Sequence, residues 1–193
     1  MNPTAAEMAI EAVEVAECNL LQSFINVTPD QVYSQILPEL NSIGWIFGHC
    51  IVHYQWVIDL SYQEKRTLSK EVCNYFRYGT TKEEILQNKP PISFRDLVDS
   101  YLSISKSSLE YLRNVDENMI YKEFVPEPEE SLLQHLHRMA FHFMGHMGQI
   151  VMIKRALGNP GPSFVDGITK PQRDMIMEKW YEWWTSSRND FHP

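Results

Sequence analysis

SLLQHLHRMAFHFMGHMGQIVMIKRALGNP, residues 131–160, predicts one long helix that carries two histidines on one face. The helix should begin near residue 130 or 131 and reach about Leu157, because the Gly-Asn-Pro that follows favours its end. Side chains four positions apart share a helix face, so His142 and His146 direct their imidazoles toward one point. Such a pair either chelates a metal or consists of satisfied histidines, and the choice depends on what other helices bring to it.

Three further segments show the same helical periodicity, and no pair of alternating apolar segments joined by a tight turn indicates a hairpin. These segments cover residues 4–25, a stretch from 41 or 42 to about 62, and a stretch that starts at Ser93 and is apolar at helical spacing up to Leu112. Four long helices predict an all-α fold, a four-helix bundle in which facing side chains can build a site. Between them we expect a short helical turn over 28–36, and a polar loop over 63–91 with one short helix at 81–86.

The C-terminal part adds a loop and one last helix, expected over residues 170–187. This additional helix contains Trp180, Trp183 and Trp184, which would either cap the bundle or cover a partner. No repeat and no clear linker divides the 193 residues, a length typical of one domain. We therefore expect residues 1–158 to form the bundle and residues 159–193 to pack on the same domain.

Composition excludes several classes of function. A formal net charge of −8 and scattered basic residues disfavour nucleic-acid binding. The cysteines, Cys18, Cys50 and Cys73, are odd in number and form no CxxC pair, so neither a disulfide framework nor a cysteine zinc site is indicated. The first residues contain glutamates where a signal peptide needs a positive start, and no apolar run approaches the roughly 20 residues of a membrane span. We expect a soluble, cytoplasmic protein that does not bind membranes.

A second histidine pair, His49 and His53, lies four residues apart in the segment 41–62. It makes further imidazole available to His142 and His146, and zinc, nickel and other divalent ions accept imidazole. A site of His49, His142 and His146 would keep one position open, as catalytic zinc sites do. His53 would then be a neighbouring or core histidine, since a fourth imidazole would close a tetrahedral site.

Other polar residues of the long helix are weaker candidates. His135 precedes His142 by seven residues and should lie about 10 Å away along the helix axis, too far to share a metal. His137 is expected to be exposed. Gln149, three residues after His146, is placed to hydrogen-bond near a metal or its water, although an ordinary surface glutamine is equally compatible with the pattern.

Several familiar motifs are missing. Phe143 stands where an HExxH metalloprotease has glutamate, and no Glu-x-x-His in the helices indicates a di-iron bundle. The chain has no CxxCH for haem and no GxxxxGK[ST] for nucleotide phosphates. No serine or cysteine lies in a nucleophile elbow, and Cys50 is expected to be a small core residue.

NSIGWIFGHCIVH (residues 41–53) and HFMGHMGQI (residues 142–150) together resemble the DinB/YfiT-like metalloenzyme family. In that family a Gly-Trp precedes a Gly-His in the second helix, and two histidines four apart precede Gly-Gln-Ile in the fourth. The resemblance covers about the first 158 residues and implies a four-helix bundle, usually a homodimer, that holds a divalent metal through His49, His142 and His146. Where the family often has another histidine or an arginine before Gly-Gln, this chain has Met147, which removes one polar contact but no ligand.

The resemblance also implies a reaction class. Some members resemble thiol S-transferases that activate a low-molecular-weight thiol, and we expect such a transfer to a small electrophilic substrate. The alternative is a hydrolase that uses metal-bound hydroxide and a proton acceptor, for which His53 is the candidate. A third alternative is a non-catalytic dimeric metal-binding or interaction module, which a fourth protein ligand would favour.

Overall fold

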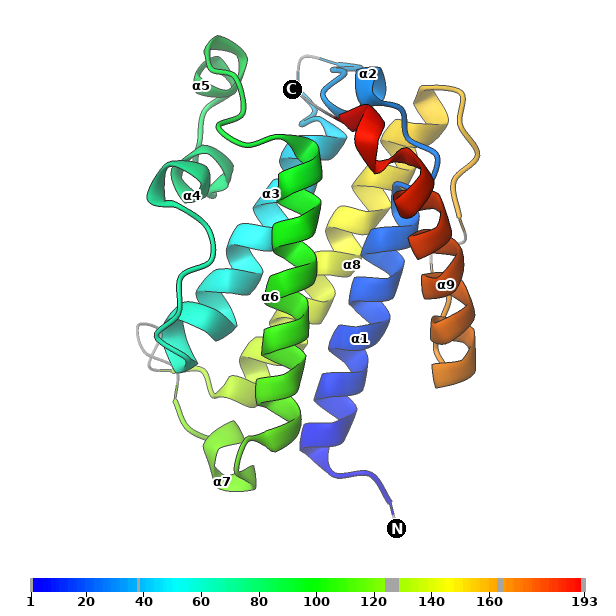
Figure 1. Ribbon diagram of the computed structural model, residues 1–193. Helices are drawn as coiled ribbons and strands as arrows, with labels where there is room; N and C mark the ends of the chain where they lie inside the picture. Colours follow the sequence, from blue (N-terminus) through cyan, green and yellow to red (C-terminus); the bar gives the residue numbers. More distant parts are fainter. Residues whose placement is uncertain (1, 38, 124–128, 163–164, 192–193) are drawn as a thin grey trace.

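The computed structural model describes residues 2–37, 39–123, 129–162 and 165–191, and four long helices in it form a bundle (Figure 1). They are α1 (Ala5–Ser23), α3 (Ile43–Tyr54), α6 (Phe94–Asn114) and α8 (Leu132–Ala156). The described residues contain no strand, only an isolated bridge, which confirms the all-α class. The other elements are α2 (Pro29–Val32), η1 (Gln55–Leu60), α4 (Lys70–Phe76), α5 (Lys82–Gln87), α7 (Glu117–Ile120), α9 (Lys170–Ser187) and η2 (Arg188–Phe191).

Side-chain caps begin the long helices where the sequence predicts them. Thr4, Ser93 and Ser131 each accept a hydrogen bond from the backbone N–H three residues later, which satisfies one of the free donors of a first helical turn. Gly158 follows α8 with φ of +84°, a conformation that costs glycine little. These signals explain why the predicted and observed ends of the long helices agree within a few residues.

Helix directions give the bundle one long crossover. α3 and α6 run the same way in Figure 1, so the chain between them must return to the end where α3 began. Residues 61–93 make this return and carry α4 and α5 along the outer side of α3. α8 runs opposite to α3 and packs against both α3 and α1. This arrangement puts the second and fourth long helices side by side, as a site shared between them requires.

The bundle core is aromatic at the end where α9 joins it. The Phe24 ring meets those of Phe47, Phe94 and Trp180 edge-on at centroid distances of 4.8, 5.7 and 6.0 Å. Trp180 and Trp184 are buried, so these two tryptophans of the last helix are part of the bundle core, and the half-buried Trp183 packs against it. No helix in the described ranges is long and apolar enough to cross a membrane.

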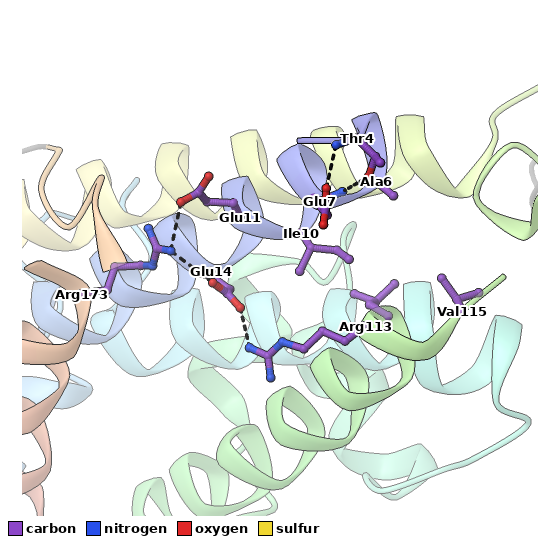
Figure 2. Close-up of a pocket in the computed structure, with 10 residues that line it drawn as sticks. Thr4, Ala6, Glu7, Ile10, Glu11, Glu14, Arg113, Val115 and Arg173 are labelled. Carbon is purple, nitrogen blue, oxygen red and sulfur yellow. Dashed lines mark hydrogen bonds and ion pairs between the residues drawn. The ribbon is translucent and has the colours of Figure 1, made fainter. Parts of the chain in front are cut away.

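Charged side chains fasten α9 to α1 (Figure 2). Arg173 is nearly buried and donates to Glu11 at 3.2 Å and to Glu14 at 3.3 Å. Its other terminal nitrogen donates to the carbonyl oxygens of Gly167 and Ile168. Glu14 also accepts from Arg113 of α6 at 2.5 Å, so this carboxylate joins three helices.

The fold departs from the sequence prediction mainly between residues 55 and 76. The second long helix continues past Tyr54 as a π-helical segment, η1, and residues 70–76, predicted as loop, form α4. The turn over 28–36 is shorter than expected, since α2 ends at Val32, and α7 interrupts the connector before α8. Polar composition predicted a loop for residues 63–91 because α4 is amphipathic over only seven residues, with Val72 and Phe76 as its buried side chains.

Candidate metal centre

Three histidines from two neighbouring helices bring their Nε2 atoms together. His49 lies on α3, and His142 and His146 lie one turn apart on α8. The Nε2 atom of His142 is 3.2 Å from that of His49 and 3.0 Å from that of His146. One nitrogen of each ring lies within 4.8 Å of the other two. These three residues are called the histidine cluster below.

Backbone and aromatic contacts fix the ring of His49. Its Nδ1 is 2.8 Å from the carbonyl oxygen of Phe76, at the end of α4. A carbonyl only accepts, so Nδ1 carries the proton and the neutral ring presents a lone pair at Nε2. Trp45 lies parallel to the ring, with centroids 5.2 Å apart, and its indole N–H donates to the Tyr75 carbonyl at 3.1 Å. α4 therefore orients the α3 member of the histidine cluster.

Gly48 allows α4 to approach so closely. A Cβ atom at this position would overlap ring carbons of Phe76, whose side chain packs directly on the backbone of α3. The close packing brings the Phe76 carbonyl within reach of the neighbouring His49. Glycine therefore precedes His49 because a larger residue there would prevent the close packing that orients the histidine ring.

Gln149 orients the ring of His146. The Nδ1 of His146 is 2.8 Å from the side-chain oxygen of Gln149, three residues on along α8. With the amide oxygen in this position, Nδ1 donates and Nε2 again carries the lone pair. The Nδ1 of His142 is buried and has no hydrogen-bond partner among the described residues, so the protein does not fix the tautomer of this ring.

The donor set fits a divalent metal ion. Two lone pairs, on His49 and His146, converge on the Nε2 of His142, where a cation or a shared proton is needed to offset their repulsion. Nitrogens that each lie about 2.0–2.1 Å from one tetrahedral zinc ion are about 3.3 Å apart, close to the distances found. Ligating histidines commonly donate their second N–H to a carbonyl or amide oxygen, as His49 and His146 do.

Burial keeps these imidazoles neutral. Burial lowers the pKa of His142 to about 2, with a further contribution from the positive charges that neighbouring histidines would carry. It also lowers the pKa of His49 and of His146, although the hydrogen bonds to Phe76 and Gln149 oppose the effect. A neutral imidazole is the form that binds metals, so the histidine cluster is ready to coordinate at neutral pH.

His53 lies beside the histidine cluster but outside it. Its ring centroid is 4.4 Å from that of His142, and its Nε2 is buried with no hydrogen-bond partner in the described part of the chain. Burial is the main reason that its pKa is lowered to about 3, and the charge of Arg138 adds to the effect. His53 is therefore a neighbour of the three nitrogens and is not one of the residues that converge.

The remaining candidates on α8 lie away from the histidine cluster. His135 is fully buried, with its Nδ1 3.2 Å from a carboxylate oxygen of Glu130 and its Nε2 2.5 Å from Arg138. His137 is exposed. Phe141 of the same helix is 76% exposed. On α3, Cys50 is fully buried and burial raises the pKa of its thiol, as expected of a core residue.

One cavity is lined by a member of the histidine cluster, and a second is lined in part by residues next to the cluster on α8. The first, of about 400 Å³, is lined by His49 and His53 together with residues of η1, α4 and the segments that flank α4. The second, of about 620 Å³, is mostly apolar and includes Gln149, the hydrogen-bond partner of His146. Both volumes suit small molecules.

Sequence reasoning missed the residues that orient the rings from α4. The four-residue spacing on two helices was a sufficient signal for the two histidine pairs, because i, i+4 geometry is local, but it did not choose between His49 and His53. Phe76 acts through its backbone carbonyl, for which side-chain type gives no signal. Gly48 was the one available hint, since a glycine inside a helix costs stability unless something packs against it.

Comparison with known proteins gives one family. A model of the DinB superfamily matches residues 12–150, a span that includes all three members of the histidine cluster. No curated protein and no solved structure gives a match to the chain.

Proposed function

Because this chain belongs to the DinB superfamily, we propose that it is a metal-dependent enzyme that transfers a low-molecular-weight thiol to a small electrophile. The observation that carries the proposal is the convergence of three imidazole nitrogens from α3 and α8. His49, His142 and His146 would hold the ion, and zinc and nickel are the metals that this donor set suits best.

The protein contributes ligand orientation. The Phe76 carbonyl and the Gln149 amide oxygen hold two rings with their lone pairs inward. When bound, a divalent ion supplies positive charge that deprotonates a coordinating thiol near neutral pH. The thiol sulfur then forms a bond to the electrophilic carbon, the leaving group departs with its bonding electrons, and the thiol proton passes to solvent.

Two cavities support a reaction of two substrates. The smaller cavity contains His49 and polar side chains, whereas the larger one contains Gln149 and mostly apolar side chains. A thiol and an electrophile would enter from the two sides and meet at the histidine cluster. Holding two reactants in place is a main source of rate enhancement for a reaction of this kind.

A hydrolase receives less support from the same geometry. It needs a proton acceptor beside the nucleophilic water. The described lining of the smaller cavity, which His49 itself lines, has no carboxylate, and the one carboxylate residue of the larger cavity, Glu39, belongs to a lining that includes no cluster histidine. His53, the predicted acceptor, is a weak base, because burial lowers its pKa to about 3. A non-catalytic module is also less well supported, since His53 does not complete a set of four protein ligands.

Metal binding is the first experiment. Purified, tag-free protein is analysed for metal content before and after reloading with zinc or nickel. We expect about one ion per chain, and loss of that ion in His142→Ala. The matched control is His137→Ala, which removes an exposed histidine of the same helix and should bind as the wild type does. Equal metal content in both variants would contradict the ligand assignment.

Thiol transfer is the second experiment. Metal-loaded protein is mixed with a small thiol and 1-chloro-2,4-dinitrobenzene, and formation of the coloured thioether is followed. We expect a rate that requires metal and falls to the uncatalysed level in His142→Ala. A metal-loaded protein that hydrolyses an ester or amide library but transfers no thiol would favour the hydrolase.

We also propose a homodimer. Phe141 and Met152 are exposed large apolar side chains on the outer face of α8, at 76% and 59% exposure, and a second copy would cover such a surface. Light scattering after gel filtration measures the mass directly. A monomer at tens of micromolar concentration would contradict this part of the proposal.

A further inference from the structure

The smaller cavity beside the histidine cluster has a charge opposite to that of the protein as a whole. The chain carries a formal net charge of −8, yet the described lining of this cavity contains two arginines and no carboxylate. The lining residues are His49, Val52, His53, Gln55, Trp56, Leu60, Arg66, Cys73, Asn74, Arg77 and Tyr78. A positive cavity in an acidic protein focuses anions toward its walls.

Arg66 and Arg77 differ from the arginines elsewhere in the bundle. Arg113, Arg173 and Arg188 each lie within ion-pair distance of an aspartate or glutamate. In the described ranges, no carboxylate lies within 4.0 Å of the guanidinium group of Arg66 or Arg77. Arg66 instead contacts the Cys73 thiol of the same cavity by a hydrogen bond. Hydrogen bonds from Thr81 and, to a smaller extent, the charge of Arg77 lower the pKa of the exposed Glu84 carboxyl. Both arginines thus have donors available for a ligand.

The loop that carries Arg66 is held by buried side chains of η1. The side-chain oxygen of Gln55 accepts from the backbone N–H groups of Thr67 and Leu68, at 2.7 and 2.5 Å, and its amide nitrogen donates to the sulfur of Cys73. Asp59 accepts from the Thr67 hydroxyl at 3.1 Å, and its backbone carbonyl accepts from Lys65 N–H at 2.9 Å. The π-helical segment therefore positions the loop and does more than extend α3, in keeping with the frequent occurrence of such segments at functional sites.

Arg77 is tied to the histidine cluster through the backbone. It follows Phe76, whose carbonyl oxygen accepts from His49 Nδ1, so one peptide unit joins the arginine to the residue that orients a cluster ring. Arg66 and Arg77 come from the two sides of α4, and both border the cavity that His49 lines. A molecule bound in this cavity would contact the two arginine side chains with one part of its surface and the histidine cluster with another.

We propose that Arg66 and Arg77 bind an anionic oxygen group, a carboxylate or a phosphate, of a substrate that fills this cavity. Guanidinium groups form paired, charge-assisted hydrogen bonds with both kinds of anion. The further assignment of this anion to the thiol rests on the proposed function, because it places the sulfur at the histidine cluster. The arginines are specificity residues in this scheme and take no part in bond making.

Anion binding to metal-free protein tests the proposal separately from the metal. Succinate and inorganic phosphate are titrated into wild-type protein and into Arg66→Gln/Arg77→Gln, with calorimetric detection. We expect at least one of the two anions to bind, with affinity lower by about tenfold or more in the double variant. The charge-matched control is Lys122→Gln/Lys179→Gln, which removes two exposed cations outside the cavity and should bind as the wild type does. Binding of neither anion, or equal loss in both double variants, would overturn the proposal, and the anion that binds identifies the preferred group.

Thiol binding to cobalt-loaded protein then separates this proposal from the proposed function. Mercaptosuccinate and 2-mercaptoethanol are titrated while the sulfur-to-cobalt charge-transfer absorption is recorded. We expect tighter binding of the anionic thiol in the wild type, a preference lost in Arg66→Gln/Arg77→Gln, and unchanged binding of 2-mercaptoethanol. Cobalt loading without any thiol signal would count against the proposed function. The anion site would then be judged by the titration of metal-free protein with succinate and phosphate. Equal affinity for both thiols in the wild type would overturn the assignment of the anion to the thiol.

Discussion

Polar side chains on the two sides of the bundle differ in whether other protein groups satisfy their hydrogen bonds. On the α1–α9 side, Arg173 and Glu14 are satisfied by groups of the protein, with Arg113 completing a chain of ion pairs (Figure 2). On the α3–α8 side, His49 and His146 use protein partners at Nδ1 only, and both turn their Nε2 lone pairs toward His142. Donors and acceptors that pair with each other, as on the α1–α9 side, stabilise the fold. Acceptor lone pairs that converge on one point, as on the α3–α8 side, indicate a binding site for a cation.

The two sides of the bundle also differ in the charges that line their cavities. The cavity of Figure 2, of about 490 Å³, is lined by Glu11, Glu14, Arg113 and Arg173, whose charges are paired with one another. The smaller cavity on the α3–α8 side has Arg66 and Arg77, and no described carboxylate lies within 4.0 Å of either guanidinium group. The cavity of Figure 2 is the larger of these two, but its charged residues already pair with one another. The smaller cavity has arginines without described carboxylates in ion-pair distance, and this favours it as the binding site for an anion. The predictions below test this division, beginning with the largest expected effect.

Gly48→Ala should damage both the fold and the metal centre on the α3–α8 side. The added methyl group overlaps the Phe76 ring, and overpacking of this kind costs about 1–3 kcal/mol of unfolding free energy. Displacement of Phe76 also moves the carbonyl that orients His49, and loss of such a contact lowers metal affinity by about 10–100-fold. Urea unfolding and competitive metal titration measure the two effects.

Gly145→Ala is the matched control for this change. Gly145 also lies inside a helix, next to His146, but an added Cβ atom would meet nothing within 4 Å. Alanine should therefore stabilise α8 by up to about 1 kcal/mol and leave metal affinity unchanged. Stabilisation by both substitutions would mean that helix propensity, and not the contact with Phe76, governs both positions.

Glu17→Gln should change the pH dependence of stability and leave the metal centre intact. Burial raises the pKa of Glu17 from 4.5 to about 7, although hydrogen bonds from Ser105, Tyr54 and Tyr101 oppose the shift. Below about pH 4.5 both folded and unfolded states are protonated, and above about pH 7 both are ionised, so ionisation destabilises the folded protein as the pH rises through this window. The variant should therefore gain about 2 kcal/mol relative to wild type between pH 5 and 8. Parallel stability curves from urea unfolding would contradict the assignment.

Arg173→Met should loosen α9 without affecting the histidine cluster. It removes nearly buried donors to Glu11, Glu14 and two backbone carbonyls, for a loss of about 1–2 kcal/mol. The control is Lys170→Met, which breaks an exposed pair with Asp174 and should cost less than about 0.5 kcal/mol. Metal content should be wild-type in both variants, and reduced content in Arg173→Met would show that the two sides of the bundle are coupled.

The long helices and the histidine cluster could be predicted because their signals are local. Caps at Thr4, Ser93 and Ser131 and the four-residue spacing of His142 and His146 each depend on neighbours within one helical turn. The choice of His49 over His53 rested on the family resemblance and on the argument for an open site. The structure brings His49 into the cluster and leaves His53 beside it.

What the sequence did not reveal depends on contacts between distant segments. α4 is short and mostly polar, and it matters for the site through the backbone oxygen of Phe76, which no side-chain pattern encodes. The π-helical segment follows from the burial of Gln55 and Asp59 against a loop that begins after it. Trp180 and Trp184 belong to the core because Phe24 lies beside the first and Phe94 beside the second, which amphipathic periodicity within α9 does not predict.

Gln149→Leu should produce the smallest effect, and it tests the orientation of a single ring. Leucine keeps the bulk of the side chain but removes the oxygen that accepts from His146 Nδ1 at 2.8 Å. The ring is then free to rotate or to change tautomer, so metal affinity should fall by about tenfold. Gln149 is exposed on α8, and stability without metal should stay within about 0.5 kcal/mol of wild type. Gln149→Glu restores an acceptor and should recover most of the affinity, since a carboxylate also accepts from Nδ1–H. If both variants bind metal as the wild type does, the His49 and His142 contacts alone orient the site, and the lone pair on His146 does not depend on its neighbour.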